Sequence, residues 1–183
     1  MKIIGHHTCS SNGIIQEIEQ KGAFLSTHLE ENLNQHKFLG SGYYFWDNNL
    51  NMAHYYGQEN YKRKYYIFEA ELNLIDDYFL DLAGNRIDMI YFQEIMSKLQ
   101  EIDESTKDWT LVQFIEFLKS KNEFPYRAIR AVNTVTNPKK VMKFVQGRDD
   151  FINLNPIFIV CLLDKKNDIV TSFKHIKTFP QNG

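Results

Sequence analysis

The sequence predicts an α+β fold that forms a single domain over residues 1–183. The chain is long enough for one compact domain with its own core, and 43% of its residues are apolar. Segments rich in β-branched and aromatic residues, which are typical of strands, lie towards both ends of the chain. Helical patterns are gathered between them, and this order favours an α+β fold over alternating βαβ units.

A short helix is predicted near the start of the chain. Residues 10–12 (SSN) are of the types that cap helices, and Gly22 marks the end. Three apolar residues at helical spacing form its buried stripe, namely Ile14, Ile15 and Ile18. Residues 24–37 are polar and lack a regular period, so we expect a loop there.

The segment FLGSGYYFWD, residues 38–47, is expected to end in a strand-to-helix turn. Asp47 is a residue type that caps helices, and the positions after it follow the spacing of one helix face. The buried positions predicted for this helix are Leu50, Ala53, His54 and Gly57. Residues 65–74 (YYIFEAELNL) are then typical of a strand.

Two helices in the middle of the chain are marked by their caps. Asn85 is predicted to cap a helix that runs to about Ile102. Thr110 and Gln113 form the capping-box pattern of the following helix. Trp109 and Phe114 complete a hydrophobic staple, and the buried stripe comprises Leu111, Phe114, Ile115 and Leu118. Further strands are predicted over residues 126–132, 155–164 and 168–179.

The charged residues are unevenly distributed along the chain, although the formal net charge is only −2. Residues 69–108 contain eleven acidic and three basic residues, whereas residues 119–148 contain eight basic residues and one acid. A solvated face would account for the basic stretch. A patch that binds the phosphates of a nucleotide or nucleic acid is the alternative.

Targeting and cysteine patterns restrict the class of protein further. The N-terminus has no apolar run long enough for a signal peptide, and no stretch approaches the length of a membrane span, so we expect a cytoplasmic protein. Cys9 and Cys161 lack metal-ligand spacing, which indicates two free thiols, with Cys161 inside a strand, and no metal site.

Residues 40–47 (GSGYYFWD) place two glycines beside a run of aromatic side chains, and Tyr55 and Tyr56 follow on the next helix. Aromatic faces hold a flat polar ring by stacking, and glycine lets the main chain approach such a ligand closely. Taken alone, the same pattern also fits half-buried core tyrosines around a tight turn.

This segment resembles a motif of the ADP-ribosyltransferase superfamily, in its diphtheria-toxin and poly-ADP-ribose polymerase branch. Residues 40–47, followed by Ala53 and Tyr55, are similar to the pattern G-x-G-x-Y-F-x-D … A-x-Y of that branch. Residues 5–8 (GHHT) resemble its strand motif H-G-T/S, and the strands predicted after residue 125 resemble its closing strands. The resemblance implies split mixed and antiparallel β-sheets with flanking helices.

The resemblance also implies roles for individual residues. His6 would bond the adenosine ribose of NAD, and Tyr44 and Tyr55 would stack around nicotinamide. Main-chain groups of the next residue, His7, would hold the carboxamide. The choice between His6 and His7 as the motif histidine is a one-residue ambiguity, and we choose His6 because Thr8 then falls at the T/S position of the motif. The implied catalytic set is His6, Tyr44 and Tyr55, and the implied NAD-binding set is His6, His7, Thr8, Gly42, Tyr44, Ala53, Tyr55 and Arg130.

The chain departs from the family pattern at the third motif position. Family members commonly carry a glutamate at the start of a late strand, but here Phe158 or a neighbour occupies it. Glu69 and Glu71 are candidate substitutes, although a solvent-facing role also fits their spacing. Arg127 and Arg130 are hypothesised to meet the pyrophosphate or an acceptor phosphate, because arginine suits bidentate contacts.

The function implied is mono-ADP-ribosyl transfer from NAD to a macromolecular acceptor, as in the small stand-alone enzymes of bacterial toxins and phage defence. The acceptor would be RNA, DNA or a protein, and an antitoxin protein is a further expected partner. The alternatives are a catalytically inactive module that binds NAD or ADP-ribose, and an NAD glycohydrolase. The missing glutamate argues against elongation of poly-ADP-ribose chains.

Overall fold

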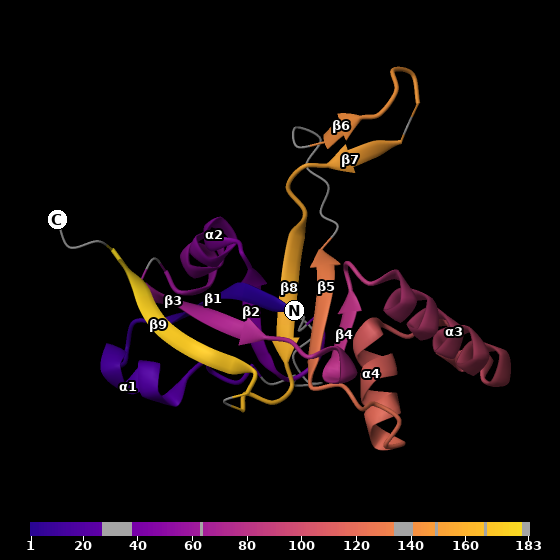
Figure 1. The fold of residues 1–183 in the computed structure, drawn as a ribbon, viewed down its shortest axis with the longest axis horizontal. Coiled ribbons are helices and arrows are strands. Elements are labelled where there is room, and N and C mark those ends of the chain that lie inside the picture. Colours follow the sequence, from indigo (N-terminus) through magenta and orange to yellow (C-terminus); the bar gives the residue numbers. More distant parts are fainter. Residues whose placement is uncertain (27–37, 63, 134–140, 149, 167, 181–183) are drawn as a thin grey trace.

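The structure, a computed structural model, describes residues 1–26, 38–62, 64–133, 141–148, 150–166 and 168–180. Its centre is a seven-stranded sheet in the order β4-β5-β8-β2-β1-β3-β9 (Figure 1). The strands are β1 (Lys2–Ser10), β2 (Tyr43–Asp47), β3 (Tyr65–Asn73), β4 (Phe79–Leu82), β5 (Ala128–Asn133), β8 (Ile157–Leu162) and β9 (Val170–Phe179). Neighbouring strands are antiparallel except β4 and β5, which are parallel.

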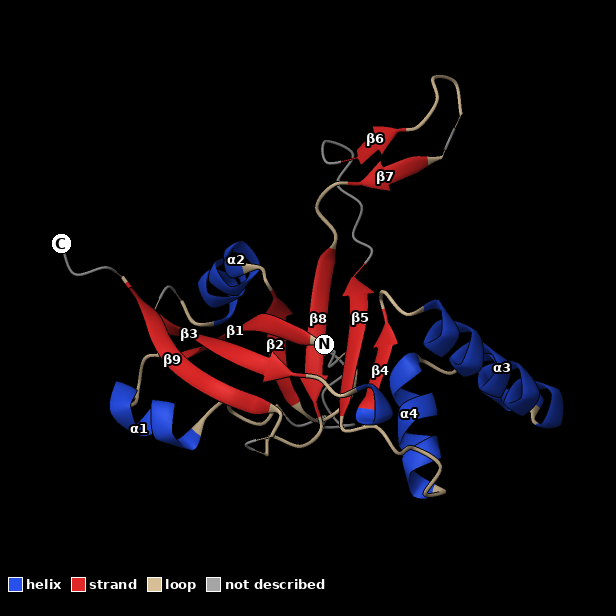
Figure 2. Ribbon diagram, in the orientation of Figure 1, coloured by secondary structure: helices blue, strands red, loops and turns tan. Residues whose placement is uncertain are grey.

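Within the described residues, four α-helices flank this sheet (Figure 2). They are α1 (Ile15–Lys21), α2 (Leu50–Asn60), α3 (Arg86–Ile102) and α4 (Leu111–Ser120), with 3₁₀ turns at Asp76–Tyr78 and Glu104–Asp108. The described chain is therefore a mixed α+β structure with a mostly antiparallel sheet, as the sequence predicts.

The sheet changes direction at its centre, where β1 meets β2. Strands β3 and β9 lie across the view of Figure 1, whereas β8, β5 and β4 stand nearly upright. β1 pairs with β3 over nine residues, but with β2 only at Gly5–Asp47 and His6–Trp46. The resemblance implies split sheets; here the two halves remain joined as one sheet through this short pairing.

The helices pack on the two halves of the sheet through separate apolar clusters. α4 buries Phe114, Ile115 and Leu118 against residues of β4, β5 and β8. α1 buries Ile18 against β1 and β3. α2 crosses β1, where the hydroxyl of Thr8 donates to the main-chain oxygen of Ala53 over 2.8 Å.

The helices with the clearest local signals agree with their predictions. Asn85 caps α3 by accepting hydrogen bonds from the N–H groups of Ile87 and Asp88. Thr110 and Gln113 form the predicted capping box of α4, and the rings of Trp109 and Phe114 lie 5.3 Å apart.

Two predicted caps are wrong. Asn49, not Asp47, caps α2, because Asp47 is still the last residue of β2 and its carboxylate pairs with Arg130. α1 begins after Ile14, whose side chain makes no cap hydrogen bond, rather than after a cap at residues 10–12. Most of the loop predicted for residues 24–37 lies outside the described residues.

The structure also contains strands that the sequence analysis omits. β4 is a four-residue strand that pairs with β5 from residue 79 to 82. Strands β6 (Val141–Lys143) and β7 (Phe151–Asn153) form a separate two-stranded ribbon between β5 and β8. This ribbon projects away from the rest of the molecule (Figure 1).

Strands from both ends of the chain meet in the same sheet, because β9 pairs with β3 and β3 with β1. Among the described residues, no helix is both long enough and apolar enough to cross a membrane.

Candidate functional site

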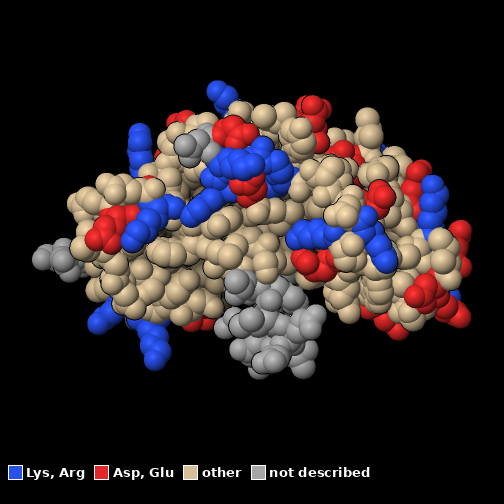
Figure 3. All heavy atoms as spheres, turned by 90° about the horizontal axis from the view of Figure 1, so that it is seen from below, with Lys and Arg blue, Asp and Glu red and all other residues tan. Residues whose placement is uncertain are grey.

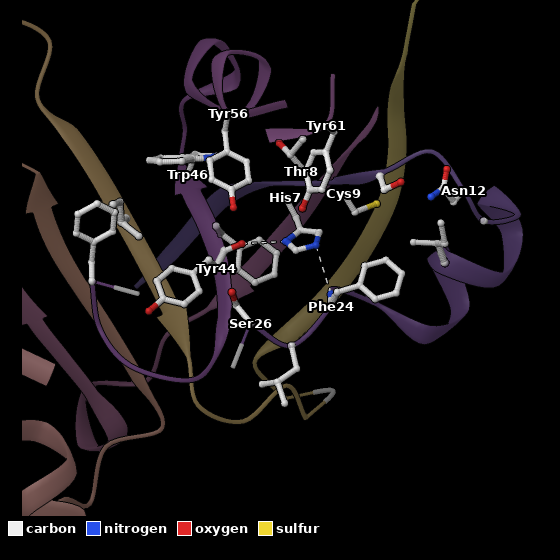
Figure 4. A pocket seen from close by; sticks show the side chains of 17 residues that line it. His7, Thr8, Cys9, Asn12, Phe24, Ser26, Tyr44, Trp46, Tyr56 and Tyr61 are labelled. Atoms are coloured by element: carbon white, nitrogen blue, oxygen red, sulfur yellow. Dashed lines mark hydrogen bonds between the residues drawn. The ribbon is translucent and has the colours of Figure 1, made fainter. Parts of the chain in front are cut away.

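A pocket of about 400 Å³ lies where β1 and β2 separate (Figure 4). Its lining comes from β1 at residues 7–10, from β2 at residues 44–46, from α2 and the residue that follows it, and from residues 24–26. Asn12, Gly13, Ile18 of α1, Phe38 and Ile159 of β8 also line it. The volume lies in the range of pockets that hold small molecules.

The strand edge that faces this pocket follows from the hydrogen-bond pattern of the sheet. The N–H of Asn48 donates to the carbonyl of Ile4 over 2.7 Å, so the main-chain groups of Ile4 point towards β2. Alternate residues of a strand point the same way, so the main-chain groups of Thr8 also face β2. The pairing register ends at His6–Trp46, and Thr8 therefore faces the gap.

His7 fills part of this gap with its imidazole. Nδ1 lies 3.0 Å from the main-chain oxygen of Tyr44, and the N–H of Phe24 donates to Nε2 over 3.3 Å (Figure 4). A carbonyl only accepts and an amide N–H only donates, which assigns the proton to Nδ1. Burial lowers the pKa of His7 to about 4, so the ring is neutral at physiological pH.

Tyr44 forms one wall of the pocket and also fastens the turn before β2. Its hydroxyl donates to the carbonyl of Gly40 over 2.6 Å and accepts from the N–H of Leu39 over 3.0 Å. Burial raises the pKa of its phenol well above the usual value. Tyr44 therefore lines the pocket as a neutral, immobilised ring.

Three aromatic side chains form a second wall of the pocket: Trp46 of β2, Tyr56 of α2 and Tyr61, which follows α2. The rings of Trp46 and Tyr56 lie 5.9 Å apart, and those of Tyr56 and Tyr61 lie 6.1 Å apart. Burial raises the pKa of Tyr56, and that of Tyr61 to about 12. These phenols are thus neutral, and their faces are available to a flat ligand.

Among the described residues that line the pocket, none is Asp, Glu, Lys or Arg. The polar groups there are hydroxyls, main-chain groups, Asn12 and the neutral imidazole of His7. A pocket of this kind favours a flat ring, and its aromatic faces attract a delocalised cation. It supplies no carboxylate to stabilise positive charge or to accept a proton.

The structure brings together some of the sequence-predicted site residues and separates others. His7, Thr8 and Tyr44 line the pocket. Tyr55 does not, because its side chain is 56% exposed and the neighbouring Tyr56 points inward instead. Ala53 lies under Thr8 as a packing residue of α2, buried completely.

His6 points to the other face of β1 from His7. It is buried, and its Nε2 lies 3.5 Å from the carboxylate of Glu69 on the adjacent strand β3. Burial lowers the pKa of His6, an effect that Glu69 partly opposes. Glu71 is exposed, so the two glutamates have unlike surroundings and neither lines the pocket.

Gly42 serves the packing of β2 against β8. A Cβ at this position would collide with Sγ of Cys161 and would lie 2.8 Å from the main-chain oxygen of Leu162. Glycine is therefore required here by the close approach of two strands. Gly42 also pairs with Ser26 through two main-chain hydrogen bonds of 2.9 Å, which hold residue 26 at the pocket.

Arg130 belongs to a buried ion network away from the pocket. Its guanidinium contacts the carboxylates of Asp47 at 2.7 Å and Asp81 at 3.3 Å. It also lies over the ring of Phe158, with 4.5 Å to the ring centre. Phe158 or a neighbour is the residue that the resemblance implies for the third motif position. Both acids and the arginine are largely buried, so the network joins β2, β4 and β5.

The basic stretch of the sequence does not form one positive surface in the described residues. Arg127 pairs with Asp164 and Asp168, and Lys119 pairs with Glu116. On the face seen from below in Figure 3, basic and acidic side chains are interspersed. Lys139 and Lys140 lie outside the described residues.

The sequence does not single out Trp46, Tyr61 or Phe24 as pocket residues. It offers Tyr56 beside Tyr55 as a candidate stacking ring, but the resemblance implies that role for Tyr55. A signal for Tyr56 existed, because it lies three residues after Ala53, which the sequence places on the buried face of the helix. Cys9 also lines the pocket, and its burial raises the pKa of the thiol to about 12, so it is not a nucleophile at neutral pH.

No group of three or more His, Cys, Asp and Glu side chains in the described part of the chain is placed to hold a metal ion. In comparisons with known proteins, no family model matches the chain, and neither does a curated protein or a solved structure.

Proposed function

We propose that this chain is a mono-ADP-ribosyltransferase that takes ADP-ribose from NAD and binds the nicotinamide end of NAD in the pocket between β1 and β2. The observation that carries the proposal is the aromatic pocket at the point where these strands separate, formed by the same segments that resemble the family motifs. We further propose that the seven-stranded sheet is an ADP-ribosyltransferase core whose halves stay joined at β1 and β2.

The main-chain groups of Thr8 are proposed to hold the carboxamide of nicotinamide. They face the unpaired gap and offer one donor and one acceptor, which is what a carboxamide needs. The residue before Thr8 is His7, so the pocket favours His7 as the motif histidine over His6. Both ring nitrogens of His7 already bond main-chain groups, which gives this imidazole a positioning role.

The tyrosine and tryptophan rings are proposed to stack on the pyridinium of NAD. Pyridinium is a flat cation, and the faces of neutral Tyr and Trp rings attract cations. The raised pKa values of Tyr44 and Tyr56 keep these phenols neutral, so stacking does not require burial of a phenolate. The anionic pyrophosphate would extend from the pocket, because no Asp, Glu, Lys or Arg is among the described residues that line it.

In the proposed transfer, the bond between C1′ of the ribose and the nicotinamide nitrogen breaks, and its electron pair leaves with neutral nicotinamide. A nucleophilic oxygen or nitrogen of the acceptor forms the new bond to C1′, and its proton passes to solvent. The residues of the pocket contribute by orienting the ring and excluding water from its faces. The acceptor is a nucleic acid or a protein.

A binding module without transfer is the second candidate, because no acidic side chain lies in the described lining of the pocket. Such a module would keep the stacking and the main-chain contacts but would leave the glycosidic bond intact. Hydrolysis of NAD, with water as the acceptor, would require the same bond cleavage as transfer.

The test uses the whole purified chain with NAD labelled on the adenylate, first alone and then with a bacterial lysate. Released nicotinamide together with label on a macromolecule supports transfer, and nuclease or protease treatment then identifies the acceptor class. Intact bound NAD supports the binding module, and free ADP-ribose without labelled macromolecule supports hydrolysis. Absence of NAD binding by calorimetry contradicts all three.

Tyr44→Ala is the matched variant for this experiment. It removes a ring from the pocket wall and should abolish nicotinamide release. Turnover at the wild-type rate in a folded Tyr44→Ala protein would contradict the placement of the nicotinamide site, whichever acceptor is found.

A further inference from the structure

The β6–β7 ribbon carries an apolar face with no described partner. Met142 lies opposite Ile152 in the register, and the N–H of Phe144 donates to the carbonyl of Asp150 over 3.2 Å. Because side chains alternate between the faces of a ribbon, Met142 and Phe144 share a face with Ile152. These three side chains are between 44% and 68% exposed.

An isolated two-stranded ribbon is only marginally stable in water unless something packs on its apolar face. The ribbon projects away from the sheet, as Figure 1 shows, and the described sheet pairs no strand with it. At roughly 200 Å² for a fully exposed large side chain, the three residues present roughly 350 Å² of apolar surface. Patches of this size commonly mark interaction sites.

A second exposed apolar feature lies on the body of the same chain, at the start of α3. Ile87, Ile90 and Tyr91 follow the spacing i, i+3, i+4 and therefore form one stripe on the helix surface. Ile87 is 78% exposed, and the other two are more than 40% exposed. By the same measure the stripe presents roughly 350 Å².

We propose that the ribbon face of one chain docks on the α3 stripe of a second copy, and that the reciprocal contact forms a two-fold symmetric dimer. Buried area selects this arrangement. Two ribbon faces packed on each other would bury only about 700 Å² in total, which is below the roughly 1,200 Å² of stable interfaces. One ribbon-on-helix contact buries about 700 Å², and the two contacts of a symmetric pair bury about 1,400 Å², which is within the usual range.

The chemistry of the two surfaces is also complementary. The three apolar residues of the ribbon face and the three of the stripe are uncharged, so contact desolvates no ion among them. Asp150 lies at the tip end of the ribbon face, where Arg86, the first residue of α3, would offer an opposite charge in a docked pair. The occupant is therefore a second copy of this chain, independent of whether the chain transfers ADP-ribose.

Analytical ultracentrifugation of the whole chain between about 1 and 50 μM tests the proposal. We expect a monomer–dimer equilibrium whose dissociation constant rises by about 30-fold or more in Phe144→Gln and equally in Ile87→Gln, because a buried anchor residue is lost twice per dimer. Ile102→Gln at the far end of α3 and Phe151→Gln on the other ribbon face are the controls, and both should dimerise like the wild type. Circular dichroism checks that all four variants fold.

Disulfide formation in trans gives a second measurement that does not depend on affinity. When Phe144→Cys and Ile87→Cys chains are mixed and oxidised, we expect a mixed covalent dimer, since the native thiols Cys9 and Cys161 are buried. A wild-type chain that stays monomeric at 50 μM, or cross-links that join only two Phe144→Cys chains, would overturn the proposal. An Ile87→Gln variant that dimerises normally would overturn it as well.

Discussion

The imidazole of His7 donates to the main-chain oxygen of Tyr44 where the ladder between β1 and β2 stops. Continuation of the register would place Thr8 opposite Tyr44, with main-chain hydrogen bonds between them. The side chain of His7 takes the Tyr44 carbonyl instead, and its other nitrogen accepts from Phe24. The pocket therefore exists because the side chain of His7, and not the main chain of Thr8, bonds the carbonyl of Tyr44. This arrangement depends on a neutral histidine, since the other ring nitrogen accepts a hydrogen bond.

The first prediction is that acid weakens the fold through His7. Its pKa is about 4 in the folded chain, against an ordinary histidine value of 6.5 that the unfolded chain retains, so the unfolded chain binds more protons between these values. The stabilisation is complete above pH 6.5 and is lost as the pH falls towards 4. For this group alone, the free energy of unfolding should be about 2 kcal/mol lower at pH 5 than at pH 7.5.

His7→Gln is the control, because an amide can donate and accept as the neutral imidazole does but does not titrate in this range. Urea unfolding at the two pH values should show a smaller loss in the variant than in the wild type. His6 also has a lowered pKa and remains in both proteins, so its contribution cancels in the comparison. An equal loss of unfolding free energy in the two proteins would show that His7 does not cause the pH dependence.

A second prediction separates two adjacent tyrosines of α2. Tyr56 lines the pocket and Tyr55 does not, so Tyr56→Ala should weaken NAD binding about tenfold through lost stacking and cation–π attraction. Tyr55→Ala should change the affinity less than twofold. Isothermal titration calorimetry measures the NAD affinity of both variants. A larger loss of affinity in Tyr55→Ala than in Tyr56→Ala would favour the residue that the motif resemblance implies, Tyr55.

Conservative replacement of Tyr44 should divide its two roles. Tyr44→Phe keeps the ring but leaves the N–H of Leu39 and the carbonyl of Gly40 without their hydroxyl partner. We expect about 1–3 kcal/mol lower stability in urea, with NAD affinity within about threefold of the wild type. A Tyr44→Phe protein that is as stable as the wild type but no longer binds NAD would mean that the hydroxyl contacts the ligand.

The buried network around Arg130 gives the fourth prediction. Arg130→Met would leave the carboxylates of Asp47 and Asp81 buried without their cation, which should cost about 3–5 kcal/mol of unfolding free energy. Lys121→Met, on an exposed lysine, should change little. The affinity of the folded Arg130→Met protein for NAD should be unchanged. A loss of NAD affinity without a loss of stability would indicate that Arg130 contacts NAD.

The elements that were predicted correctly carry local signals. The capping box of α4 and the Asn85 cap of α3 are contacts between residues within three positions of each other, so the sequence displays them directly. β4 could not be found this way, because its four residues, which include Asp81, owe their conformation to parallel pairing with β5, which lies about fifty residues later. The β6–β7 ribbon has too few residues per strand for a clear period.

The ambiguity among the site residues comes from offsets of one position. One residue turns a side chain to the opposite face of a strand, which separates His6 from His7. On a helix it rotates the side chain by about 100°, which separates Tyr55 from Tyr56. The motif pattern therefore falls on segments that line the pocket, but which residue faces inward depends on packing such as that of Ala53 beneath Thr8.

The position of β8 has a consequence for how the protein matures during synthesis. β8 lies between β5 and β2 and supplies Ile159 to the pocket, yet it follows β2 by about 110 residues in the sequence. Until residues 157–162 have been synthesised, one edge of β2 is unpaired and the pocket lacks Ile159. Ligand binding should therefore appear only after β8 has left the ribosome, and until then the nascent chain carries an unpaired strand edge at which chaperone binding competes with aggregation.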